Sequence, residues 1–332
     1  MEFPKQDFAP TMAEQLAVKP VGSDGCLFES VHCPLRMGNA APIAYGGSTL
    51  GMAVTAAAHT VQPTHKLYSV LGHFLGPAGT ASPVRVRVDR TRDTKSFATR
   101  RVQVLQDQNG KERVCLDLLM DFHVVEAAYY QYSTPPVQPL DAAPPAACLS
   151  WEQQIADHLA NKTIGRTVAA LAVKTFAPLH NFFENRDMPQ GISAQNLAGV
   201  IKKVATTQDD LPITSKWSGV WLRQRNRDSQ EQESDAAQWA SLAFVMDAAL
   251  SFLPLAYDHR FLDDAGACSS LDLALRIFQP NVDLRKWHLR QSMTGTADAG
   301  RTYSENVLWD GEGRMVASMT QQSILRAPGP KM

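Results

Sequence analysis

One long apolar run stands out in the sequence, residues 239–254, which read WASLAFVMDAALSFLP. The fifteen residues before Pro254 carry a single charge, that of Asp247. Such a run predicts about four turns of helix, apolar on nearly every side and ended by the proline. A lone carboxylate there is hydrogen-bonded, protonated or used for chemistry, because burying an unpaired charge is costly. The alternative is an Asp247 at the exposed rim of the helix, or one satisfied by neighbouring backbone.

A second helix is predicted after the turn Tyr45-Gly46-Gly47-Ser48, where a run of small residues begins. The two glycines allow close approach of the backbone, and the small residues favour tight packing. Position 50 is leucine, so the segment departs from the G-x-S-x-G nucleophile turn. Ser48 is therefore predicted to be an N-cap rather than a nucleophile.

Alternation of apolar and polar residues predicts strands around both helices. In the first half they cover residues 26–33, 67–75, 84–90, 97–105 and 114–125. In the second half a helix at 151–159 precedes strands at 217–223, 271–278, 287–294, 302–309 and 315–325. The segments 102–118 and 305–321, about 203 residues apart, both read as strand, turn and strand. One α+β unit, a sheet wrapped around a helix, is therefore predicted twice.

The best boundary between the two units is the segment 133–148, which holds five prolines. Such a segment predicts a stiff linker. We therefore expect an N-terminal domain at 1–132, a linker at 133–150 and a C-terminal domain at 151–332. The polar run at 223–235 is expected to be a solvated loop.

Composition narrows the range of functions. The formal net charge is −1, from 32 basic and 33 acidic residues, which argues against nucleic acid as a partner. No segment approaches eighteen apolar residues, so no membrane partner is expected. The five cysteines are irregularly spaced and the phosphate- and dinucleotide-binding motifs are missing, so we expect no metal and no cofactor. A cytoplasmic protein is expected; the alternative is peroxisomal, from the ending Pro330-Lys331-Met332.

A basic segment at 85–101 contains seven cations against Asp89 and Asp93. The favoured interpretation is one solvated sheet face. The alternative is a docking place for an anionic carrier, either a nucleotide-bearing thiol cofactor or an acidic carrier protein.

Two polar residues near the predicted strands could act with Asp247. Ser270 opens the strand at 271–278, and Gln321 lies inside the last strand. An aspartate can accept a proton from water, while a hydroxyl and an amide hold that water or a carbonyl in place. His73 stands beside Phe74 in a strand, where a core or interface histidine is the alternative to a functional one.

The chain resembles the double-hotdog acyl-CoA thioesterase II (TesB-like) family, of bacterial and peroxisomal type, from about Leu16 to Arg326. The similarity rests on the following segments: YGGSTLGMA, HFLGPAG, RDTKSFATRRV, VWLR, DAALSFLP, SLDLALRIF and GRMVASMTQQSILR. This similarity implies a double-hotdog fold. A homo-oligomer is also expected.

The resemblance also implies a site. In that family an Asp, a Ser or Thr and a Gln orient a water that attacks the thioester carbonyl, and they correspond to Asp247, Ser270 and Gln321. The glycine turn at Gly46 and Gly47 opens the other hotdog helix, whose N–H groups could receive the oxyanion. Tyr45, Gly46, Gly47 and His73 are the expected substrate-binding residues.

Departures from the family bear on the substrate. Tyr68, Leu71 and Leu273 stand where the family usually has histidines, and the loop 225–235 is lengthened. These changes favour a specialised acyl or polyketide thioester, on CoA or on a carrier protein. The leading hypothesis is a thioester hydrolase. The alternatives are a hotdog enzyme that dehydrates or cyclises a thioester-derived intermediate, and a non-catalytic acyl-binding protein.

Overall fold

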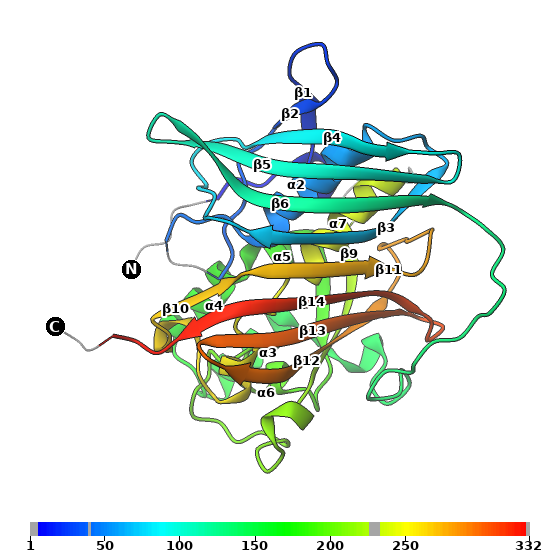
Figure 1. Cartoon of the computed structure of the whole chain (residues 1–332). Coiled ribbons are helices and arrows are strands. Elements are labelled where there is room, and N and C mark those ends of the chain that lie inside the picture. The colour runs from blue at the N-terminus through cyan, green and yellow to red at the C-terminus, as the bar shows by residue number, and fades with distance from the viewer. Residues whose placement is uncertain (1–5, 39–40, 226–232, 330–332) are drawn as a thin grey trace.

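The computed structural model describes residues 6–38, 41–225 and 233–329. Within these residues the predicted plan is confirmed: two helices lie against one large, curved sheet (Figure 1). Two features expected from the sequence fall outside the described residues, namely the ending Pro330-Lys331-Met332 and most of the polar loop, residues 226–232.

The first repeat contains the central helix α2 and the strands that wrap it. Its elements are α1 (Met12–Gln15), β1 (Val18–Pro20), β2 (Leu27–Ser30), α2 (Gly46–Ala58), β3 (His65–Phe74), β4 (Arg85–Asp93), β5 (Phe97–Gln108) and β6 (Lys111–Val124). The strands predicted from alternation are present, and their ends differ from the prediction by a few residues.

The second repeat has the same plan and adds a group of short helices before its central helix. These first elements are η1 (Pro145–Ala147), β7 (Leu149–Ser150), α3 (Trp151–Ala160), α4 (Arg166–Thr175), α5 (Ala177–Phe182), β8 (Phe183–Asp187), α6 (Ile192–Asn196) and η2 (Ile213–Ser215). The core elements follow: β9 (Ser218–Gln224), α7 (Asp235–Met246), α8 (Leu253–Tyr257), η3 (Leu262–Asp264), β10 (Ala267–Ser270), β11 (Asp272–Ile277), β12 (His288–Asp298), β13 (Arg301–Asp310) and β14 (Met315–Arg326). The helix predicted at 151–159 is α3, whereas α4, α5 and β8 were not predicted from the sequence.

The strands form one antiparallel sheet in the order β1-β2-β4-β5-β6-β3-β11-β14-β13-β12-β9-β8-β7, with β10 paired to β14. The repeats join where β3 pairs with β11, which places Val70 opposite Leu275. Figure 1 shows β4, β5, β6, β3, β11, β14 and β13 stacked in this order in front of α2 and α7. This is the double-hotdog architecture expected above.

Residues 125–144 connect the two repeats without helix or strand. They lie against the second repeat, because the indole N–H of Trp309 donates to the carbonyl of Thr134 at 2.8 Å. The side chain of Gln291 likewise accepts from the N–H of Val137 at 2.7 Å. The proline-rich segment thus has the irregular backbone expected of it, and the domain boundaries 1–132, 133–150 and 151–332 stay a prediction.

The two central helices touch each other through their backbones. A Cβ atom on Gly47 of α2 would lie 2.6 Å from the carbonyl oxygen of Phe244 in α7. One on Gly51, a turn further along α2, would lie 3.0 Å from the carbonyl oxygen of Ala240. Residues four apart share one face of a helix, so both glycines face α7 and any larger residue would separate the helices.

The central helix of the second repeat is shorter than predicted. It ends at Met246, Asp247 is its C-cap residue, and Ala249 has a positive φ of 74°. The prediction of a continuous helix to Pro254 is therefore wrong, and Pro254 instead lies in the first turn of α8. The end of a helix leaves carbonyl groups without intrahelical partners, so something else must bind them here.

Side chains from other elements bind those carbonyls. The Tyr45 hydroxyl donates to the carbonyl of Phe244 at 2.7 Å, and the Arg290 guanidinium donates to the next carbonyl, that of Val245. The Asn306 amide then donates to the carbonyls of Met246 and Ala248, at 2.8 and 3.0 Å. Long-range contacts thus end the helix, and the local sequence does not reveal them.

Ser48 is not the N-cap of α2. The N-cap residue is Tyr45, which makes no side-chain capping bond. Ser48 lies inside the helix and is buried, and its hydroxyl accepts from the N–H of Leu35 at 3.0 Å. The serine therefore fixes the loop that precedes the helix.

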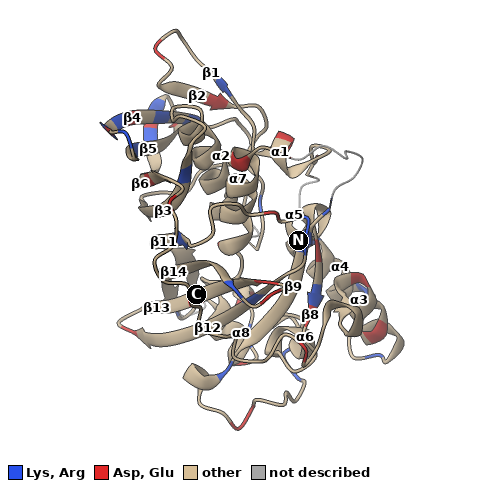
Figure 2. Cartoon of the chain, turned by 90° about the vertical axis from the view of Figure 1, so that its right-hand side faces the viewer, with Lys and Arg blue, Asp and Glu red and all other residues tan. Residues whose placement is uncertain are grey.

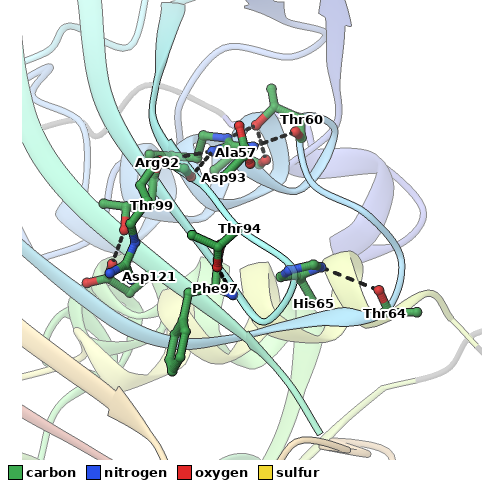
Figure 3. Close-up of polar contacts among 11 residues, drawn as sticks. Ala57, Thr60, Thr64, His65, Arg92, Asp93, Thr94, Phe97, Thr99 and Asp121 are labelled. Carbon is green, nitrogen blue, oxygen red and sulfur yellow. Dashed lines mark hydrogen bonds and ion pairs between the residues drawn. The ribbon is translucent and has the colours of Figure 1, made fainter.

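The basic segment divides into buried and paired side chains. Arg100 is 1% exposed and donates to the hydroxyl and carbonyl of Thr60 and to Asp93. These two partners, Thr60 and Asp93, lie close together beside Arg92 in Figure 3. Arg101 lies on the outer face of the sheet and is paired with Asp117. Arg100 is therefore part of the packing, so the favoured prediction that it lies on a solvated sheet face is wrong, and a buried guanidinium does not fit the alternative of carrier docking either.

Replacing Gly47 with alanine should destabilise the fold. The added methyl group meets backbone and the Tyr45 ring at 2.5–2.7 Å, and overpacking of this kind costs about 1–3 kcal/mol of unfolding free energy. Urea unfolding followed by tryptophan fluorescence measures this change in unfolding free energy. Gly76→Ala is the control, since a Cβ there meets nothing within 4 Å. Equal unfolding free energies for the two variants would contradict the close helix contact.

Replacing Arg100 with methionine should lower the stability of the fold far more than the same replacement of Arg101. Arg100→Met leaves the buried hydroxyl of Thr60 and three backbone carbonyls without this donor, and should lower the unfolding free energy by at least about 2 kcal/mol. Arg101→Met should leave the unfolding midpoint nearly unchanged. Thermal unfolding by circular dichroism compares them, and similar midpoints would contradict the structural role of Arg100.

Candidate active site

Asp247 lies where the two repeats meet, and both repeats hold its carboxylate. The residue is 5% exposed. Its Oδ2 accepts from the N–H of Gly47 in the first repeat at 2.7 Å. Its Oδ1 accepts from the side-chain amide of Gln321 in β14. The carboxylate is thus a hydrogen-bonded, buried group, which is one of the states expected from the sequence.

Gln321 connects Asp247 with Ser270. The amide is almost fully buried, and its Oε1 accepts from the Ser270 hydroxyl at 3.0 Å. Its nitrogen points to Asp247, so the direction of each hydrogen bond in the chain is fixed. Ser270 ends β10, where it is opposite Ser323 of β14, two residues beyond Gln321 on the same face. The structure therefore brings the three predicted polar residues together.

The surroundings of Asp247 make its carboxylate more basic. Burial is the largest influence and raises the pKa of Asp247 to about 6. Hydrogen bonds from the Gln321 amide and the Gly47 N–H act in the opposite direction. A carboxylate with a pKa near 6 can accept a proton from water close to neutral pH and release it again.

The glycine pair has a different role from the one expected. The N–H of Gly47 donates to Asp247, so it is not free for an oxyanion. A Cβ atom on Gly46 would lie 2.9 Å from Oδ2 of Asp247 and 2.9 Å from the Phe74 ring. Gly46 thus leaves room for the carboxylate. Gly46 is the first residue of α2, and its N–H makes no hydrogen bond in the described part of the chain.

Tyr45 serves the architecture of the site. Its ring packs edge-on against Phe244 at 5.0 Å between centroids, and its hydroxyl donates to the Phe244 carbonyl. Burial, followed by the charge of Asp247, raises the pKa of Tyr45 well above its usual value. The hydroxyl therefore stays protonated and ties the start of α2 to the end of α7.

His73 is not brought to this site. Its side chain is exposed, while its neighbour Phe74 points toward Gly46. Successive side chains of a strand point to opposite faces, so His73 lies on the outer face of the sheet. There it is opposite Asp117 and Asp272. Its expected role in binding substrate next to Asp247 does not fit this position.

Arg290 and Asn306, which hold the end of α7, were not predicted from the sequence. Both are buried, in β12 and β13. Their same-face neighbours along the strands, Ser292 and Ser304, are polar, and most apolar residues of both strands lie on the other face. Alternation therefore predicts an exposed face at Arg290 and Asn306, and the sequence carries no local signal for their role.

Two further features, a metal site and a membrane-spanning helix, are not found among the described residues. No group of three or more His, Cys, Asp or Glu side chains there could hold a metal ion. None of the helices described is both long enough and apolar enough to span a membrane.

The pKa of Asp247 predicts a specific dependence of stability on pH. The native state binds this proton more tightly than the unfolded state, in which aspartate has a pKa near 3.9. Protonation of Asp247 therefore adds its full contribution to the unfolding free energy below about pH 4. This contribution, about 2–3 kcal/mol, is lost as pH rises through about 6. Urea unfolding at several pH values should show wild type losing stability relative to Asp247→Asn over that range. A constant difference between the two proteins would contradict the raised pKa.

Both halves of the chain match models of one protein family. Residues 33–123 match the acyl-CoA thioesterase N-terminal domain. Residues 180–325 match the acyl-CoA thioesterase C-terminal domain. Together the two matches take in both central helices and most of the sheet, including Asp247, Ser270 and Gln321.

Solved structures share the fold over nearly the whole chain. The acyl-CoA thioesterase II TesB2 from Mycobacterium marinum superposes with a TM-score of 0.66 at 19% identity, covering 97% of this chain and 99% of that one. A putative thioesterase II from Thermobifida fusca gives 0.66 at 16% identity, with 95% and 98% covered. A hot dog fold protein of unknown function from Alicyclobacillus acidocaldarius gives 0.65 at 14% identity, with 96% and 98% covered. On the family matches the chain belongs to the acyl-CoA thioesterase family, and it shares the double-hotdog fold of these solved structures.

Proposed function

We propose that this protein hydrolyses an acyl-CoA thioester at Asp247, Ser270 and Gln321. The observation that carries the proposal is the hydrogen-bonded chain from Ser270 through Gln321 to a buried carboxylate that can take up a proton near neutral pH. Family membership supports the same reaction class.

In the proposed reaction Asp247 is the general base. A carboxylate oxygen has a second lone pair beyond the one engaged by its present partner, so Asp247 can also accept a hydrogen bond from water. The Ser270 hydroxyl donates its hydrogen bond to the Gln321 oxygen, so the Ser270 oxygen is left as an acceptor for the second water hydrogen. Water attacks the thioester carbon, its proton passes to Asp247, the C–S bond breaks, and the proton goes to the leaving thiolate. The products are a free thiol and a carboxylic acid, which releases the second water proton to solvent as it ionises to the carboxylate.

The start of α2 supplies the proposed oxyanion site. The N–H of Gly46 is the first of the helix and lies next to the Asp247 carboxylate. A helix N-terminus carries partial positive charge, which favours the negative charge that develops on the thioester oxygen. In this proposal Gly47 positions the base while Gly46 stabilises the oxyanion.

The family matches favour CoA as the bearer of the acyl group, and the surface charge gives no specific support to an acidic carrier protein. Arg85 and Arg87 are paired with Glu112, and Arg101 with Asp117. Figure 2 shows basic and acidic residues interspersed near β4, β5 and β6. An acidic carrier domain would require a surface with excess positive charge, and these pairings reduce it.

Replacement of the three residues tests the assignment through thiol release from a panel of acyl-CoA thioesters. Asp247→Asn removes the proton acceptor at nearly constant shape and should lower turnover by about two to four powers of ten. Gln321→Ala should lower it on the order of a hundredfold. Because the residues act on one water, double variants should lose little beyond the worse single variant.

Ser270 provides the matched control for these variants. Ser270→Thr keeps the hydroxyl and should remain active, whereas Ser270→Ala should lose activity. Circular dichroism confirms that each variant is folded before assay. Wild-type turnover in folded Asp247→Asn would remove the carboxylate from the reaction and leave an acyl-binding protein or a different hotdog reaction as the explanation.

A further inference from the structure

The surroundings of the Asp247 carboxylate include both buried and partly exposed residues. The groups that bond to it are buried. Three residues close to this arrangement are partly exposed, namely Gly46, Ser270 and Phe74. The proposed reaction uses Gly46 for the oxyanion and Ser270 for the water, and it leaves Phe74 without a role.

The Phe74 ring lies directly beside the carboxylate. A Cβ atom on Gly46 would be 2.9 Å from Cζ of this ring and 2.9 Å from Oδ2 of Asp247. The ring edge and the carboxylate oxygen are therefore separated by at most twice that distance. A second ring atom, Cε1, would lie 3.0 Å from the same point. Phe74 thus approaches the proposed base across a space about as narrow as the side chain that Gly46 lacks.

The backbone fixes the ring in this position. Phe74 ends β3, and its N–H donates to the carbonyl of Leu271, the residue after Ser270, at 2.9 Å. The ring packs against the core cluster to which both central helices contribute. Phe74 is therefore held where the two repeats join, close to the oxyanion donor and to the strand end that carries Ser270.

The chemistry of the ring limits what it can do to the carboxylate. A phenyl ring donates no conventional hydrogen bond, so its effect is to displace water, which disfavours the charged form of a carboxyl group. Burial is the largest influence on the pKa of Asp247 and raises it to about 6, while the bonds from Gly47 and Gln321 act in the opposite direction. Removal of the ring would let water return and leave those donors in place, so the pKa of Asp247 should fall.

We infer that Phe74 is a positioning residue that acts through Asp247: its ring is the apolar wall beside the carboxylate and keeps bulk water from it. The inference rests on the proposed function for the role of Asp247 as the base. It adds a residue that makes no polar contact with water or thioester and that comes from the other repeat.

The other titratable groups near the carboxylate keep one state over the acidic pH range. Tyr45 approaches it from the start of α2 and stays protonated, because its pKa is raised well above the usual value. Arg290 of β12 binds the carbonyl of Val245 and remains charged, as arginine does in proteins. On β10, burial raises the pKa of Cys268 to about 11. A change in the acidic range therefore reports Asp247.

The pH dependence of kcat/KM for thiol release tests the inference. Its acidic limb reports the pKa of the base in the free enzyme, about 6 in wild type. Phe74→Ala should move this limb to lower pH by at least about half a unit, because hydration of the carboxylate increases. Phe74→Leu keeps an apolar wall and should lie between the two. The substrate is the same throughout, so its own ionisation does not contribute to the difference.

The two neighbours of Phe74 along the chain provide matched controls. Leu75 is 59% exposed, so Leu75→Ala should keep the acidic limb of wild type. Histidine titrates in the same pH range, but His73 lies on the outer face of the sheet opposite Asp117 and Asp272. His73→Gln should therefore keep the limb as well. A shift in either control as large as that in Phe74→Ala would overturn the inference.

Urea unfolding provides a readout that needs no activity. The raised pKa of Asp247 makes wild type lose stability relative to Asp247→Asn as pH rises, until the carboxyl group is fully ionised. In a Phe74→Ala background the same comparison should show a smaller loss that is complete at lower pH. Phe74→Leu replaces Phe74→Ala in this comparison if the alanine variant does not fold.

The outcomes separate the inference from the proposed function. A shift in the unfolding data without thiol release by wild type supports the shielding role of Phe74 and contradicts hydrolysis. Thiol release with one acidic limb shared by wild type, Phe74→Leu and Phe74→Ala overturns the inference and leaves hydrolysis intact. A limb that moves to higher pH in Phe74→Ala also overturns it.

Discussion

The candidate site depends on the contact between the backbones of α2 and α7. Only where these helices touch can the N–H of Gly47 in one repeat reach the Asp247 carboxylate in the other. Gly47 and Gly51 permit that approach, since a methyl group at either position would overlap a carbonyl or a neighbouring side chain. The site is thus composite: neither repeat alone holds the carboxylate, and the glycines that bring the helices together also leave room for it.

This contact places a carboxylate where burial opposes its charge, and the hydrogen bonds limit that effect without removing it. Full neutralisation by a nearby arginine would hold the pKa of Asp247 low and make it a poor base. The structure instead gives it neutral donors, the Gly47 N–H and the Gln321 amide, and the pKa settles at about 6. Neutral partners stabilise the charged form moderately, so the proton can move in both directions near neutral pH.

Local patterns were enough to predict the sheet, and together with the family resemblance they singled out three polar residues that the structure brings together. They did not reveal the features that long-range contacts decide. Alternation found the strands because one face of each is buried. The end of α7 was misplaced because Arg290 and Asn306, on distant strands, bind its last carbonyls. His73 was misassigned through parity, since its neighbour Phe74 takes the inward face. Arg100 was placed among exposed cations, although its partners Thr60 and Asp93 bury it.

The early end of α7 depends on side chains held on distant strands. One nitrogen of the buried Arg290 guanidinium in β12 donates to the Val245 carbonyl, and the Asn306 amide in β13 donates to the carbonyls of Met246 and Ala248. Had α7 continued to Pro254 as a helix, Asp247 would lie in its interior and would not be its C-cap. The position of the proposed base is therefore set by contacts from β12 and β13 as much as by the helix that carries it.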